Sequence, residues 1–152
     1  MPCYVTLPLD VIKPNPRNAR THSKKQIQQI VRSIHEFGFA TPVLVDDSYM
    51  LIAGHGRVAA ARVLAMAAVP ALVLSGLPEA KKRALMVADN RIVENAGWDR
   101  EILALELASL NEMLVDENLD IALTGFEAAE IDILHTDFEE TTRDAAEDVS
   151  RD

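Results

Sequence analysis

The sequence predicts a small domain of the α/β (α+β) class, followed by a C-terminal helical extension. Through the first hundred residues, short apolar runs typical of strands alternate with stretches of helical periodicity. One of these runs leads straight into a glycine-rich turn and then a helix. The 152 residues suffice for one hydrophobic core, and 49% hydrophobic and 26% charged residues are ordinary for a globular protein.

A strand, a loop and a helix are expected first. Tyr4 to Leu9 is short, apolar and partly β-branched, as strands are. Two prolines between Pro14 and Arg20 predict an irregular loop. Ser23 and Gln26 form a capping box, and the helix that follows is expected to end at Gly38. Its apolar side chains fall at helical spacing: Ile27, Ile30, Val31, Ile34 and Phe37.

A hairpin, a helix, a strand and a second helix are expected next. Pro42–Val45 and Tyr49–Ala53 flank a short polar turn, which is the pattern of a hairpin. The alanine-rich stretch from Val58 to Ala67 has high helix propensity. Val69–Leu74 predicts a further strand, and a first-turn proline opens a helix from about Glu79 to Glu94.

The last third of the chain is predicted to be helical and then disordered. Asp99 is the expected N-cap of a helix with a regular apolar face. A short strand is expected at Leu119 to Leu123, and a last helix at Phe126 to Leu134. From Thr136 onward, acidic residues, Thr and Ser dominate, which favours disorder. We therefore expect a domain at residues 1–95, a helical extension packed on it at 96–135, and a disordered acidic tail at 136–152.

The charges are segregated along the chain. The net charge is −9, but residues 1–100 hold 13 Lys/Arg and 8 Asp/Glu, whereas residues 101–152 hold 2 Lys/Arg and 16 Asp/Glu. The first part is therefore suited to phosphates, and the second is repelled by nucleic acid. The alternative is that the acidic residues only keep the C-terminal helices soluble.

The cellular setting expected from the sequence is the cytoplasm, with no membrane partner. The single cysteine, Cys3, excludes an intramolecular disulfide and a multi-cysteine zinc site. No apolar run approaches the length needed to cross a bilayer, and the first residues lack the layout of a signal peptide.

The junction at Gly54-His55-Gly56-Arg57 is the motif most indicative of chemistry. The two glycines allow a sharp turn and a close approach of a ligand to main-chain N–H groups. The helix start behind them suits an anionic phosphate, and Arg57 adds donors that match phosphate oxygens. His55 is the candidate for proton transfer. A Gly-x-Gly-x-x-Gly pattern is absent, so a triphosphate or ribose phosphate is favoured over a dinucleotide.

For several other polar or aromatic residues, a purely structural role is an alternative to a functional one. His22 and His35 lack partners at metal-ligand spacing, so we predict a loop histidine and a histidine on a helix surface. Arg17, Arg20, Lys24 and Lys25 form a basic patch that either meets phosphates or is simply solvated. Trp98 is expected to be a packing anchor.

Several separated blocks of the chain together resemble the N-terminal domain of ParB proteins, which has the fold of sulfiredoxin. The blocks are Ile12-Lys13-Pro14-Asn15-Pro16 with Arg20, Ser33-Ile34 with Gly38-Phe39-Ala40-Thr41-Pro42-Val43, and Leu51-Ile52-Ala53-Gly54-His55-Gly56-Arg57 with Ala60-Ala61. The likeness is strongest to a variant found in DNA modification methyltransferases and phage-related proteins, in which Ala88-Asp89-Asn90-Arg91 and Trp98-Asp99 recur. It implies a small mixed sheet with flanking helices.

The resemblance implies a nucleotide site that holds CTP or ATP with magnesium. In ParB, the equivalent of the Gly54–Arg57 loop holds the phosphates of CTP, and a Glu-Asn motif matched by Asp89 and Asn90 contributes to binding of the triphosphate and magnesium. Carboxylate and amide oxygens are suitable ligands for that ion. The nucleotide-binding residues expected here are Gly54, His55, Gly56, Arg57, Arg20, Thr41, Pro42, Asn90 and Arg91.

Three departures from the family pattern restrict the chemistry that is expected. The usual ParB loop is Gly-Glu-Arg-Arg, and its middle residues are replaced by His55 and Gly56; the closing arginine of the second motif is matched by Val93. These changes predict weak or absent CTP hydrolysis. The loop cysteine of sulfiredoxin is matched by His55, so sulfiredoxin chemistry is not expected.

Three functions therefore stay open at the level of sequence. The first is a nucleotide-binding module of a DNA-modification or segregation system, with a protein partner such as a methyltransferase domain and with DNA reached only through a partner or a dimer. The second is an enzyme, either a weak nucleotide hydrolase or phosphotransferase with His55 as base, or a nuclease. The third is a protein-interaction adaptor that uses the acidic helices. The chain lacks the catalytic motifs of a methyltransferase.

Overall fold

The computed structural model describes residues 2–149. The chain divides into two compact units, Met1–Ala96 and Gly97–Asp152. The division falls one residue beyond the expected end of the first domain at residue 95. That the second region packs on the first stays a prediction. Within residues 2–149, no helix combines the length and the apolar character that crossing a bilayer would require.

The first unit is built on a four-stranded mixed sheet with the strand order β1-β4-β2-β3. β1 (Cys3–Pro8) pairs antiparallel with β4 (Ala68–Val73), β4 pairs parallel with β2 (Val43–Val45), and β2 pairs antiparallel with β3 (Leu51–Ala53). The strands and the hairpin predicted for this unit are confirmed. β2 and β4 have partners on both sides, and their inward-facing side chains are fully buried: Val43, Val45, Val69 and Ala71.

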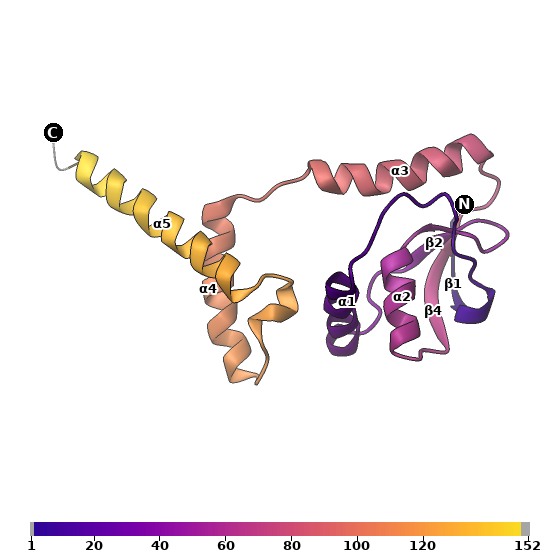
Figure 1. Ribbon diagram of the computed structural model, residues 1–152, viewed down its shortest axis with the longest axis horizontal. Helices are drawn as coiled ribbons and strands as arrows, with labels where there is room; N and C mark the ends of the chain where they lie inside the picture. The colour runs from indigo at the N-terminus through magenta and orange to yellow at the C-terminus, as the bar shows by residue number, and fades with distance from the viewer. Residues whose placement is uncertain (1, 150–152) are drawn as a thin grey trace. The chain divides into compact units, whose positions relative to one another are not determined.

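Of the three helices in this unit, α1 (Lys24–Phe37) and α2 (His55–Val63) lie side by side, whereas α3 (Glu79–Asn95) contacts β3 (Figure 1). α1 begins as predicted, because the Ser23 hydroxyl accepts a hydrogen bond from the Gln26 amide at 3.1 Å. It ends at Gly38, whose φ of 79° lies in the region that favours glycine. α3 follows β4 and starts directly after Pro78, also as predicted.

α2 (His55–Val63) occupies a different span from the predicted Val58 to Ala67. It begins three residues early because Gly54 turns β3 directly into the helix. It ends early because Leu64 is the C-cap and Ala65 has a φ of 55°, which an α-helix cannot continue. As a result, His55, Gly56 and Arg57 belong to the first helical turn, and only Gly54 forms the loop.

The second unit consists of two long helices and a short turn of 3₁₀ helix. α4 (Arg100–Asp116) is capped by Asp99 as predicted, through a 3.1 Å hydrogen bond from the Ile102 amide. The strand predicted at Leu119 to Leu123 is wrong. The Asp120 carboxylate accepts from the Ala122 amide at 2.8 Å and starts η2 (Ile121–Thr124) in its place.

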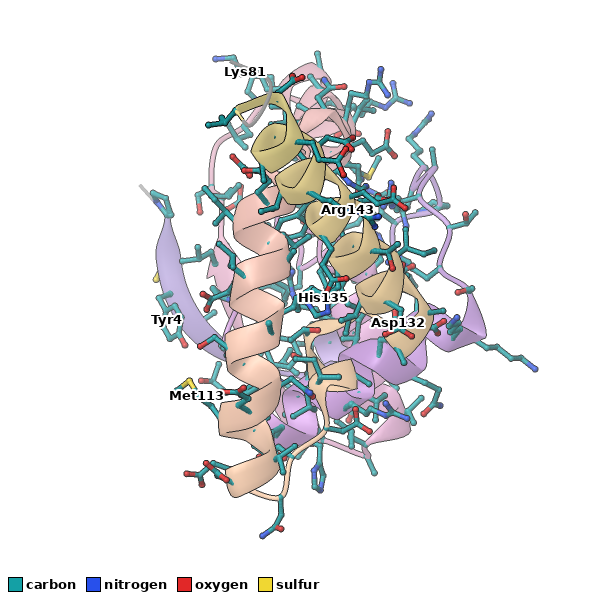
Figure 2. The ribbon with its side chains drawn as sticks, turned by 90° about the vertical axis from the view of Figure 1, so that its left-hand side faces the viewer. Tyr4, Lys81, Met113, Asp132, His135 and Arg143 are labelled. Atoms are coloured by element: carbon teal, nitrogen blue, oxygen red, sulfur yellow. The ribbon has the colours of Figure 1, made fainter. Side chains whose placement is uncertain are left out.

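The last helix is much longer than expected. α5 (Ala128–Val149) includes most of the stretch from Thr136 for which we predicted disorder, so that prediction is wrong up to Val149, and residues 150–152 lie outside the described part. Its first half packs on α4 through Ile131 and Leu134, and His135, which lies between the two helices in Figure 2, donates to the Ala104 carbonyl at 3.1 Å. A few apolar side chains therefore suffice to pack α5 on α4, because helical periodicity places them on one face of the helix.

Candidate functional site

Gly54 shapes the junction between β3 and α2. Its φ of 102° is accessible to glycine, and a Cβ atom at this position would lie 2.5 Å from Cγ1 of Val43. The first intrahelical hydrogen bond runs from the Val58 amide to the Gly54 carbonyl at 2.9 Å. The amides of His55, Gly56 and Arg57 precede that bond, so they are donors presented at the positive end of the helix.

A cleft of about 140 Å³ opens at this helix end. It is lined by the start of α2, by the loop before α1 and by α3, all within the Met1–Ala96 unit. The structure thus brings together seven of the predicted site residues: Arg20, Gly54, His55, Gly56, Arg57, Asp89 and Asn90. Two polar residues that the sequence analysis did not assign to the site, Asn18 and His22, line it as well.

Arg57 carries a positive charge that the protein neutralises only in part. Its Nη2 donates to the Pro42 carbonyl at 3.0 Å, whereas its Nε is buried without a hydrogen-bond partner. Burial lowers the pKa of the Arg57 guanidinium, and the carboxylate of Asp89 opposes this effect. A buried donor without a partner is costly, so the protein itself satisfies this guanidinium only in part.

His55 is a neutral hydrogen-bond donor at the same end of α2. Its Nε2 accepts a hydrogen bond from the Asn15 amide at 3.4 Å, so the proton of the neutral ring lies on Nδ1. Burial, followed by the neighbouring His22, lowers the pKa of His55. The ring is therefore uncharged near neutral pH, and its Nδ1–H can donate to a ligand.

The role expected for Gly56 is corrected by the structure. We predicted that both glycines leave room for a ligand, but Gly56 is buried by the protein itself. A Cβ atom there would lie 3.0 Å from both the Ile30 Cδ1 and the His22 Cε1 atoms. Gly56 therefore makes room for α1 and its preceding loop, and only Gly54 has the turn-forming role.

A second cleft of about 200 Å³ adjoins the first and shares Arg20 and Asn90 with it. Glu94 pairs here with Arg20, and its other carboxylate oxygen lies 3.2 Å from Nη1 of Arg91. Arg91 thus lines this neighbouring cleft. Ion pairing with Glu94 reduces the positive charge that Arg20 offers to the first cleft.

Two predicted residues lie outside these clefts. Thr41 is exposed and does not belong to the lining of either cleft. Pro42 acts indirectly, because its carbonyl oxygen holds the guanidinium of Arg57. The segment before β2 therefore orients a cleft residue, while direct contact with a nucleotide stays a prediction.

The predicted magnesium ligands contribute little to a metal site on their own. Asp89 is exposed at the cleft, and the Asn90 side-chain amide donates to the Met86 carbonyl at 2.9 Å. Among the residues that the structure describes, no three His, Cys, Asp or Glu side chains are grouped to hold a metal ion. One carboxylate and one amide do not form a protein-held magnesium site, so magnesium binding stays a prediction.

The sequence analysis did not assign His22 to the site, although one of its two contacts is local. Its Nδ1 lies 2.9 Å from Oε1 of Gln26, one helical turn further along. That local pair was a detectable signal, since a histidine just before a capping box can reach the first turn of the helix. Its contact with Gly56 had no sequence signal.

Comparison with known proteins connects this site to a family. Residues 3–91 match the model of the ParB N-terminal domain, and residues 101–152 match that of the ParB-methyltransferase HTH domain. The chain is 51% identical over 76 residues to the ParB-like nuclease domain-containing protein YnaK of Escherichia coli strain K12. It is 40% identical over 73 residues to the chromosome-partitioning protein Spo0J of Thermus thermophilus.

The extent of these matches differs. The match to YnaK covers 50% of this chain and 87% of YnaK. The match to Spo0J covers 45% of this chain and only 27% of Spo0J. Among solved structures, the chain resembles the C-terminally truncated chromosome-partitioning protein ParB from Caulobacter crescentus complexed with CTP-gamma-S. The TM-score is 0.69 at 25% identity, over 85% of this chain and 74% of that one.

Proposed function

Because the chain belongs to the ParB N-terminal domain family, we propose that the Met1–Ala96 unit binds the phosphates of a nucleoside triphosphate, CTP or ATP, at the start of α2. The observation that carries the proposal is that Arg57, whose guanidinium is only partly satisfied by the protein, lines the cleft at the start of α2. Phosphate oxygens are acceptors that match a guanidinium. The relative from Caulobacter crescentus was crystallised with a CTP analogue, which supports a nucleotide as ligand.

Electrostatics support the same ligand. The cleft is lined by the cations Arg20 and Arg57 and by one anion, Asp89, although the chain as a whole has a net charge of −9. The positive end of α2 adds to this local field. The charged residues of the cleft thus favour an anion there more than the net charge of the chain suggests.

Hydrogen-bond geometry supplies the specificity for phosphate. Three backbone amides at the start of α2, the Nδ1–H of His55 and the guanidinium of Arg57 are donors around one cleft. Such a convergence of donors suits the tetrahedral oxygens of a phosphate group. The proposal requires no protein-held metal.

Melting temperature with and without nucleotide tests the proposal. CTP, ATP, ADP and GTP are each added with and without magnesium, and a triphosphate is expected to raise the melting temperature. Arg57→Ala removes the buried guanidinium and is expected to abolish the rise. The matched control is Arg62→Ala, an exposed arginine on the same helix, which keeps it. No rise with any nucleotide, or an equal rise in Arg57→Ala, contradicts the proposal.

Turnover is the alternative function of the same cleft. A hydrolase or phosphotransferase needs a general base, and His55 is the candidate. Its Nε2 is already engaged by the Asn15 amide, so weak turnover or none is expected. Release of inorganic phosphate from CTP and ATP distinguishes binding alone from turnover.

The second unit is proposed to bind a protein partner such as a methyltransferase domain. Its match to the ParB-methyltransferase HTH domain supports a methyltransferase as partner, and the 16 acidic residues beyond residue 100 disfavour bare DNA. Trp98 and Phe126 meet edge to face with ring centroids 5.5 Å apart, but Trp98 is 68% exposed, so it is not the buried packing anchor that we expected. They line an apolar groove of about 220 Å³, and Trp98→Ala tests whether a purified methyltransferase domain binds there.

A further inference from the structure

The helix α4 of the second unit has apolar side chains on two of its faces. One face contributes three buried side chains to the core that α4 shares with α5: Leu103, Ala104 and Leu107. The other face carries three large apolar side chains that are 65%, 57% and 61% exposed: Ile102, Leu105 and Met113. A helix at the surface of a globular protein normally has one apolar face, and a helix that is apolar all round is normally covered. The second face of α4 therefore has the character of a contact surface.

The three exposed side chains form one stripe along the helix, called here the α4 stripe. At 3.6 residues per turn, Ile102, Leu105 and Met113 fall within an arc of roughly 80°, on the side opposite the core residues. Figure 2 shows Met113 on the side of α4 that faces away from α5. None of the three lines the groove that contains Trp98 and Phe126. The α4 stripe is thus a separate surface.

Carboxylates border the α4 stripe on both sides. On the same helical geometry, Glu106 lies along one edge, and Glu101 and Glu112 lie along the other. All three glutamates are exposed. The helix contains one basic residue, Arg100, and its Nη2 is engaged by the Asp137 carboxylate of α5 at 3.0 Å. The surroundings of the α4 stripe are therefore negative along its whole length.

This combination of charge and apolar surface selects the kind of partner that fits. A second copy of the chain would bring its own glutamates against Glu101, Glu106 and Glu112, and like charges in an interface oppose association. A helix whose apolar face is bordered by Lys or Arg complements both features, as in pairs of helices whose charged side chains flank an apolar seam. The distance from Ile102 to Met113 is about 16 Å along the axis, which corresponds to three helical turns.

We propose that the α4 stripe docks a basic amphipathic helix of another protein. The surface is distinct from the phosphate cleft and from the groove of Trp98 and Phe126, so the inference does not rest on the function proposed for either. The apolar side chains supply most of the affinity, and the bordering carboxylates select a basic partner. Because the carboxylates are exposed, binding is expected to weaken as the salt concentration rises.

Fluorescence anisotropy of a labelled synthetic peptide with the full chain tests this inference. The probe has about 18 residues, long enough to form a helix, with Leu on one face and Lys along both edges of that face. One control peptide has Glu in place of each Lys, and another has the residues of the probe in scrambled order. The probe is expected to bind about tenfold more tightly than either control peptide.

Variants of the chain then locate the binding surface. Ile102→Gln and Leu105→Gln are each expected to weaken binding of the probe about tenfold. The double variant Glu106→Gln with Glu112→Gln is expected to weaken it about threefold and to reduce its salt dependence. Val115→Gln is the matched control and keeps the wild-type Kd, because Val115 is 63% exposed on the same helix but lies outside the α4 stripe. Melting temperatures show that each variant is folded.

Four outcomes would overturn the proposal. The first is equal binding of the probe and the scrambled peptide, and the second is an unchanged Kd in both Ile102→Gln and Leu105→Gln. The third is a loss of binding confined to Ile133→Ser, which would place the probe in the groove that Ile133 lines with Trp98. The fourth is a dimer in light scattering that dissociates in Leu105→Gln, which would identify a second copy of the chain as the occupant.

Discussion

The ammonium group of Lys82 lies 3.1 Å from Oδ2 of Asp46, which joins α3 to the turn of the β2–β3 hairpin. Asp46 is only 7% exposed, and its Oδ1 accepts from the Ser48 amide, the Ser48 hydroxyl and the Met50 amide at 2.9 to 3.0 Å. The carboxylate thus organises the turn and also anchors the helix that carries Asp89 and Asn90 to the cleft. This anchor was not expected from the sequence.

Acid is predicted to unfold the protein partly through Asp46. Burial alone raises the pKa of this carboxyl, but the hydrogen bonds from Met50, Ser48 and Lys82 outweigh burial, and the net pKa lies below its ordinary value. A carboxyl whose pKa is depressed by folding stabilises the protein at every pH above its ordinary pKa. That stability is lost as the pH falls through the folded-state pKa. Asp46→Asn is expected to cost about 1–2 kcal/mol of unfolding free energy at neutral pH and to reduce the loss below about pH 4.

Urea unfolding at a series of pH values measures this effect. Asp10→Asn, at an exposed position in the first unit, is the control and should follow the wild type. A curve for Asp46→Asn that parallels the wild type between about pH 5 and pH 3 would show that the Asp46 carboxylate does not contribute.

Gly54→Ala is predicted to destabilise the first unit by about 3 kcal/mol, because the left-handed backbone and the contact with Val43 are both unfavourable to a Cβ atom. Gly97→Ala is the matched control, since a Cβ atom there would meet no other atom within 4 Å. Thermal or urea unfolding of both variants gives the comparison. Equal stability of the two variants would mean that the β3–α2 junction tolerates a side chain.

Glu94→Gln is predicted to strengthen triphosphate binding. Glu94 pairs with Arg20 and Arg91, so its neutralisation returns positive charge to the cleft that Arg20 lines. Because these ion pairs are exposed, the gain is expected to be modest, roughly two- to fivefold in Kd. Calorimetric titration with CTP measures it.

Glu79→Gln serves as the control for that experiment. Glu79 is an exposed glutamate on the same helix whose partners are Lys82 and Arg83, at the opposite end from Glu94. An equal increase in both variants would indicate a general effect of net charge rather than release of Arg20.

The chain alone is predicted not to bind duplex DNA at about 0.15 M salt, where phosphate contacts by basic residues supply most of the affinity. Residues 101–152 contain 16 acidic and 2 basic residues, although they match an HTH family model. Fluorescence anisotropy with a labelled duplex over a range of salt concentrations measures this. Tight binding that weakens steeply with salt would identify a basic surface formed by a dimer or by the first unit.

The predictions that succeeded depended on local signals. The Ser23 and Asp99 caps, the hairpin and the start of α3 after Pro78 are each determined by residues within one helical turn or one strand pair. The predictions that failed required knowledge of packing. The run from Leu119 to Leu123 is as apolar as a strand, but Asp120 starts a helical turn, and Ile121 packs against the core of α4 and α5.

The sequence by itself determined the order of strands and helices in the first unit, the family, and the glycine-to-arginine junction at which an anion is expected. Only the tertiary structure decided that Gly56 accommodates His22 instead of a ligand, that Glu94 pairs with Arg20 across 74 positions, and that Nε of Arg57 is buried without a partner. Caps and turns depend on neighbouring residues, which a linear pattern records. Contacts between distant segments depend on how side chains fill the space between packed elements, and no local pattern specifies that.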